Sequence, residues 1–154
     1  MYLTKQLIVT HDAQLTKLKI VPKCMKTKLS YQLKMYDPQK KRIVRRQFCF
    51  SRVAAISFSL NYFDNPIGAE ACGFYEIFDR EVKEDLLEQN FLARREGFLL
   101  PGNYDYDPTD PSDLLNERTV FEQVRDKLDS YRLFQQQTTG GIYLILAQKW
   151  KVRD

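Results

Sequence analysis

With 154 residues, 44% of them apolar, the chain is long enough to bury the core of one domain and too apolar to be disordered. Cys24, Cys49 and Cys72 are odd in number and form no C-x-x-C pair, which argues against a disulfide framework and a zinc finger. The net charge of +4 conceals two opposite halves: residues 1–54 hold 13 basic and 2 acidic residues, whereas residues 61–130 hold 7 basic and 17 acidic residues. Such an asymmetry indicates charged partners.

The sequence shows no targeting or membrane-spanning segment. Its longest apolar run, Ile142 to Ala147, has six residues, whereas a span of the bilayer needs roughly 20. The N-terminal run Leu7-Ile8-Val9 is shorter than the core of a signal peptide. We therefore expect a cytoplasmic protein that does not associate with membranes.

The first half is predicted to be an antiparallel β-meander of three or four strands. Leu18 and Ile20 alternate with lysines up to Val21-Pro22, and an eleven-residue alternation from Met25 to Met35 predicts a half-buried strand. Asp37-Pro38 favours a type I turn, after which the chain returns through residues 43–50. A further strand is expected from Val53 to Tyr62.

The second half is predicted to be mainly helical. Residues 74–78 suggest a short strand, and Asp79 is a candidate N-cap for a helix to about Arg94. The prolines and glycine between Phe98 and Ser112 predict a loop, followed by a helix over 113–135. A final strand is expected over 142–152. The helices are expected to pack on the sheet through Val82, Leu86, Phe121, Val124 and Leu128.

These elements define a single α+β domain over residues 1–154: an antiparallel β-meander with two helices packed on one face and a C-terminal strand completing the sheet. No repeat or low-complexity segment interrupts it.

The sequence carries no recognisable catalytic motif. His11 is the only histidine, and it is interpreted as ending the first element together with Asp12. The oxygen-rich segment 103–113 lacks the glycine and glutamate that a calcium loop needs at fixed positions. We predict a protein that is not an enzyme and that uses no cofactor or metal.

Two charged surfaces are candidate binding sites. Tyrosines and carboxylates in the 103–113 loop and on the first helix could bind a basic protein, since tyrosine gives contact area and carboxylates steer association. These residues are Tyr104, Asp105, Tyr106, Asp107, Asp110, Glu81, Glu84, Asp85 and Glu88.

The alternative is a nucleic-acid site on the polar side of the predicted strands. It consists of Lys17, Lys19, Lys26, Lys28, Lys34 and Arg45. Two points weaken it: only Tyr36 and Tyr2 are candidates for stacking on bases, and lysine on exposed strands also prevents edge pairing. The acidic half could also offset the positive field.

Residues 10–65 carry a family resemblance. His11-Asp12-Ala13-Gln14-Leu15 opens the first β segment, and Phe50-Ser51-Arg52-Val53 ends the meander. This order resembles small bacterial families with a His-Asp-Ala-x-Leu motif, some of which are immunity proteins of polymorphic toxin systems. The resemblance implies a cytosolic, non-enzymatic protein that binds and blocks a toxin, for which a nuclease with a basic cleft is a natural candidate. It assigns no functional residues.

Overall fold

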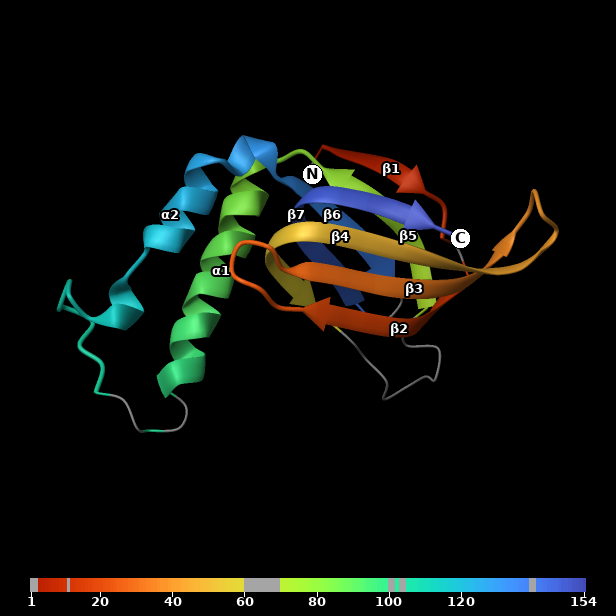
Figure 1. The fold of residues 1–154 in the computed structure, drawn as a ribbon. Coiled ribbons are helices and arrows are strands. Elements are labelled where there is room, and N and C mark those ends of the chain that lie inside the picture. Colours follow the sequence, from red (N-terminus) through yellow and green to blue (C-terminus); the bar gives the residue numbers. More distant parts are fainter. Residues whose placement is uncertain (1–2, 11, 60–69, 100–101, 103–104, 139–140) are drawn as a thin grey trace.

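The computed structural model describes the chain except for residues 1–2, 11, 60–69, 100–101, 103–104 and 139–140. Within the described residues, one antiparallel sheet of seven strands and two helices make up the fold (Figure 1). The elements are β1 (Thr4–Ile8), β2 (Ala13–Val21), β3 (Lys28–Asp37), β4 (Arg42–Phe58), β5 (Glu70–Ile77), α1 (Arg80–Leu99), α2 (Thr119–Asp126), β6 (Arg132–Thr138) and β7 (Gly141–Arg153). The predicted α+β class is confirmed, and the C-terminal strand belongs to the sheet.

The sheet curls into a closed ring, because β5 pairs with both β2 and β6. Its order is β1-β5-β2-β3-β4-β7-β6, and β5 also pairs with β6 along most of its length. The contact between β5 and β2 that closes the ring spans only Ala13 opposite Ala71 and Gln14 opposite Glu70. Elsewhere that edge of β5 pairs with β1.

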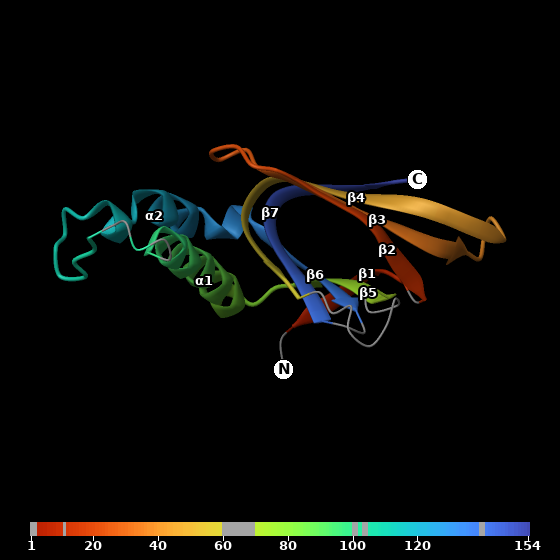
Figure 2. The same cartoon turned by 90° about the horizontal axis from the view of Figure 1, so that it is seen from below.

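Strands β4 and β7 bend and connect two layers of the curled sheet. In Figure 2, β2 and β3 lie in one layer and β1, β5 and β6 in the other, with β4 and β7 running through both. The bend in β4 contains Arg52, whose φ of +51° is in the left-handed region, and a register shift follows between Val53 and Ala55. Such bulges strengthen local twist and redirect a strand.

An aromatic core fills the inside of the curled sheet. The rings of Tyr31 and Phe48 stack with centroids 4.9 Å apart, and those of Phe74 and Phe134 stack at 5.7 Å. The buried hydroxyl of Tyr31 donates a hydrogen bond of 3.0 Å to the Gln136 side-chain oxygen. Burial raises the pKa of Tyr31 well above its usual value, so this hydroxyl remains protonated.

A second core lies between the sheet and the helices, which sit against its bent end (Figure 2). On the helical side it contains Leu86, Phe121, Val124 and Leu128, all buried as predicted, with Val82 packed at its margin. On the sheet side it contains Ala55, Ile77, Leu133 and Leu146. The carboxylate of Asp79 caps α1 by accepting the N–H of Glu81 at 2.9 Å.

The prediction of a helix over residues 113–135 is wrong at both ends, because α2 begins only at Thr119, after a 3₁₀ turn at Leu114–Asn116. Helix α2 ends at Asp126, a short 3₁₀ turn follows at Leu128–Ser130, and residues 132–138 form β6. Leu133 faces the helices while Phe134 faces the aromatic core, so both sides of β6 are buried. A strand buried on both faces shows no polar alternation, so no strand signal marked residues 132–138 and the predicted helix extended to residue 135.

Other boundaries also differ from the prediction. The two strands expected over 43–50 and 53–62 are a single strand, β4, up to Phe58, and β3 begins at Lys28 rather than Met25. Helix α1 continues to Leu99, past Arg94. Strand β1 was not predicted, because its residues are exposed or half-buried and follow no alternation.

Candidate functional site

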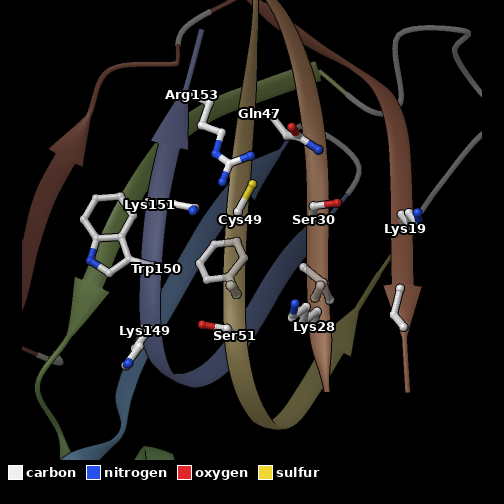
Figure 3. Close-up of a pocket in the computed structure, with 13 residues that line it drawn as sticks. Lys19, Lys28, Ser30, Gln47, Cys49, Ser51, Lys149, Trp150, Lys151 and Arg153 are labelled. Atoms are coloured by element: carbon white, nitrogen blue, oxygen red, sulfur yellow. The ribbon is translucent and has the colours of Figure 1, made fainter. Parts of the chain in front are cut away.

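The outer side of β2, β3, β4 and β7 carries a cluster of cations. Successive side chains of a strand point to opposite faces, so the residues between those of the aromatic core project outward. Eight of these outward residues are exposed lysines or arginines, and we call them the basic face: Lys17, Lys19, Lys28, Lys34, Arg45, Lys149, Lys151 and Arg153. Figure 3 shows five of them on neighbouring strands.

The strand register arranges these cations in rows across the sheet. Each row contains residues that lie directly opposite one another on adjacent strands, and consecutive rows are about 7 Å apart along the strands. The rows align Lys28 with Ser51 and Lys149, Lys19 with Ser30, Cys49 and Lys151, Lys17 with Gln32, Gln47 and Arg153, and Lys34 with Arg45.

A pocket of about 530 Å³ lies in the middle of this face (Figure 3). Short side chains, Ser30, Cys49 and Ser51, line it on β3 and β4. Long cationic side chains from β2, β3 and β7 surround them. The hollow therefore follows from the sequence: small polar residues occupy the central positions of the rows and lysines or arginine occupy the outer ones.

The basic face has no internal neutralisation from its own strands. Residues 13–21, 28–36, 42–58 and 141–153 contain no aspartate or glutamate. Lys34 and Arg45 stand directly opposite each other, a pairing of like charges that destabilises a sheet. Asp37, at the end of β3, is buried and bonded to Arg46 at 2.9 Å. The surface consequently presents a strong positive field.

Protection of sheet edges explains only part of this face. Beyond Gln14, β2 pairs with β3 alone among the described residues, so Lys17 and Lys19 could serve to block edge pairing. Lys28 and Lys34, however, lie on β3, which has neighbours on both sides. Their charges need another explanation.

The structure brings together all residues of the predicted basic site except Lys26. Lys17, Lys19, Lys28, Lys34 and Arg45 all lie on the basic face. The placement of Lys26 on this strand surface is wrong, because Lys26 lies in the β2–β3 turn, where its N–H donates to the Lys23 carbonyl at 3.0 Å. The three cations of β7 were not among the predicted site residues, although their alternation with Trp150 and Val152 is a strand signal.

The predicted acidic loop is held together by its own side chains. The Tyr106 hydroxyl donates a hydrogen bond of 2.7 Å to the Asn116 side-chain oxygen. The same hydroxyl accepts a hydrogen bond of 3.1 Å from the Arg95 guanidinium. Asp107 accepts the Thr109 hydroxyl at 2.7 Å, which holds the pKa of Asp107 below its usual value. Asp110 similarly accepts the backbone N–H and hydroxyl of Ser112. Asp105 is exposed, and Tyr104 lies outside the described residues.

The predicted carboxylates of α1 divide into two pairs. Glu84 forms an ion pair with Arg80 at 3.0 Å. Glu88 binds Arg118 at 2.6 Å, and this hydrogen bond lowers the pKa of Glu88. Glu81 and Asp85, one helical turn apart, are exposed. The prediction that these residues contact a partner stays a prediction.

Comparisons with known proteins found no match among family models, curated proteins or solved structures. In the described part of the chain, no three His, Cys, Asp or Glu side chains are grouped closely enough to hold a metal ion. His11 falls outside that part. None of the helices described here has the length and apolar character required to cross a bilayer.

Proposed function

We propose that this protein binds nucleic acid through the basic face. The observation that carries the proposal is the convergence of eight exposed cations from four strands on a surface whose strands hold no outward carboxylate. Phosphate backbones supply most of the affinity of nucleic acids for proteins by releasing counterions when lysine and arginine bind. Ser30, Gln32 and Gln47, between the cations, are side chains that commonly hydrogen-bond phosphate oxygens.

The extent of the face favours a polymer over a small phosphate compound. The cationic rows continue along the seven residues of β3 from Lys28 to Lys34, which correspond to about 20 Å of extended strand. A nucleotide would contact one or two of these rows, whereas a strand of nucleic acid would contact all of them. The repeated charge therefore matches a repeated ligand.

The test is the salt dependence of binding to a labelled oligonucleotide, followed by fluorescence anisotropy. We expect the logarithm of the affinity to fall linearly with the logarithm of the salt concentration. The slope of this line should be about −0.7 to −0.9 for each phosphate contacted. The triple variant Lys28→Gln, Lys34→Gln, Lys151→Gln should bind more weakly and with a smaller slope. The matched control Lys5→Gln, Lys127→Gln removes exposed lysines outside the basic face and should bind like the wild type. Absence of binding at about 50 mM salt would contradict the proposal.

A second candidate function is the one implied by the resemblance to immunity proteins: inhibition of a toxin by direct binding. The exposed Glu81 and Asp85 on α1 favour it, because they lie on the helical part of the molecule and could bind a basic protein. We expect a stoichiometric basic protein to co-purify from nuclease-treated host lysate and to elute as salt rises. The double variant Glu81→Lys, Asp85→Lys should no longer retain this basic protein, whereas the control Glu96→Lys should still retain it. A partner that disappears on nuclease treatment would instead support nucleic-acid binding.

A further inference from the structure

Two apolar side chains lie exposed at one end of the basic face. Tyr36, two residues beyond Lys34 on β3, is 57% exposed, and Ile43, directly opposite it on β4, is 62% exposed. Both have the outward parity of the cations and form the row next to Lys34 and Arg45. The basic face thus ends in an apolar platform.

This platform contributes little to the folded core. Tyr36 and Ile43 are outside both hydrophobic clusters, whereas Met35 and Val44, their neighbours in sequence, belong to or pack against the aromatic core. A tyrosine ring offers a flat surface on which a nucleic-acid base can stack. Such stacking tolerates any base, because every base has a π face.

Building on the proposed function, we infer that the ligand is single-stranded nucleic acid that lies along β3 and β4. Its phosphates contact the successive rows of cations, and one base stacks on Tyr36 with Ile43 beside it. A duplex keeps its bases stacked on one another, so it has no free base face to offer Tyr36. Backbone contacts from lysine and stacking on an aromatic ring are the two components of single-strand binding surfaces.

The experiment compares two ligands and three variants by fluorescence anisotropy. The ligands are a labelled deoxythymidine oligonucleotide of roughly 16 nucleotides, within the usual site sizes for single-strand binding, and a duplex of the same length. The variants are Tyr36→Ala, Tyr36→Phe, and the control Phe78→Ala. Phe78 is also an exposed aromatic residue, 47% exposed, but it follows β5 and lies away from the basic face.

We expect the wild type to prefer the single strand. Tyr36→Ala should lower its affinity for the single strand by about tenfold, the effect of one lost stacking contact. The salt slope should stay unchanged, because no phosphate contact is removed. Tyr36→Phe and Phe78→Ala should bind like the wild type. Since Tyr36 is exposed, thermal melting should confirm that all variants fold.

Two results separate this inference from the proposed function. Equal affinity for both ligands, or unchanged affinity in Tyr36→Ala, would overturn the single-strand inference. The proposed binding of the phosphate backbone by the basic face would still stand. If neither the single strand nor the duplex bound the wild type, both the single-strand inference and the proposed function would be overturned.

Discussion

At the scale of single residues, Asp37 shows how a charge is accommodated beside an apolar core. Its carboxylate accepts the backbone N–H groups of Gln39 and Lys40 at 2.9 and 3.2 Å and the Arg46 guanidinium at 2.9 Å. Arg46 interrupts the apolar face of β4, and this pairing, together with its contact to Asp154 at 2.8 Å, explains its position there. One aspartate thereby closes the β3–β4 turn and neutralises the arginine.

These hydrogen bonds make the turn sensitive to acid. They lower the pKa of Asp37, the bond from the Lys40 N–H contributing most, below the value of about 3.9 for an unfolded aspartate. Its contribution to stability is therefore complete above about pH 4 and disappears as pH falls through the folded pKa. Asp37→Asn keeps an oxygen for the turn but has no charge to titrate.

We expect wild type to be more stable than Asp37→Asn at pH 7 and the difference to shrink below about pH 4. Urea unfolding at a series of pH values measures it. A difference that does not change with pH would contradict the role given to the charge. Asp105→Asn, an exposed carboxylate in the acidic loop, is the control and should show little difference at any pH.

At the scale of elements, helix α2 depends on its packing. It has eight residues, fewer than an isolated helix needs to be stable in water. Phe121 and Val124 are buried against α1 and the sheet, and the Arg118 guanidinium lies 4.5 Å from the Phe91 ring and 4.1 Å from the Phe121 ring. The side chains of Arg118 and Phe121 thus fix α2 to α1.

Replacing Phe121 with alanine should cost about 3–5 kcal/mol in unfolding free energy, the usual effect of removing a buried aromatic ring. The neighbouring Val120 is 55% exposed, so Val120→Ala should change stability by less than about 0.5 kcal/mol. Denaturant titration measures both. A loss below about 1 kcal/mol for Phe121→Ala would show that α2 is not packed as described.

The elements that could be predicted from sequence are those with one buried face. The alternation around Leu29 and Leu33, with the Asp37-Pro38 turn, was sufficient to predict the β3–β4 hairpin. The spacing of apolar residues was sufficient to predict the core residues of α1 and α2. Strand β6 could not be found this way, because Leu133 and Phe134 are buried on opposite faces. Closure of the sheet could not be found either, since the pairing of Ala13 with Ala71 leaves no pattern in the sequence.

The candidate site shows the same limit. Lysines on β2 and β3 could be grouped because those strands are adjacent in sequence. Lys149 and Lys151 join them only through the pairing of β7 with β4, about 100 residues away. In the acidic loop, composition pointed to a partner, but Asp107 and Asp110 make local turns that composition does not reveal.

At the scale of the whole molecule, the two kinds of charge occupy different parts. The basic face lies on the sheet, and the acidic residues of α1 and the following loop lie at the helical end (Figure 1). Ion pairs such as Arg80–Asp129 and Arg118–Glu88 join groups within the acidic half, and Arg46–Asp37 joins groups within the basic half. These pairs leave the separation between the halves intact.

We expect this separation to cause association at low salt. The acidic helical end of one molecule is complementary in charge to the basic face of the next. Such head-to-tail contacts can continue from molecule to molecule without closing into a ring. Light scattering should show a mass that rises with protein concentration at about 0.01 M salt and returns to the monomer near 0.15 M, where charges are screened beyond about 8 Å. Glu81→Gln, Asp85→Gln should weaken the effect. A monomer at every salt concentration would contradict it.

The closure of the sheet also governs how the protein can be made. Strands β6 and β7, which are synthesised after the other five, supply the neighbours of β5 and β4, and Phe134 of β6 packs against Phe50 and Phe74 in the aromatic core. Pairings between distant segments form slowly. We therefore expect a nascent chain to carry the first five strands out of the ribosome with part of their aromatic core uncovered until residues 132–153 are synthesised.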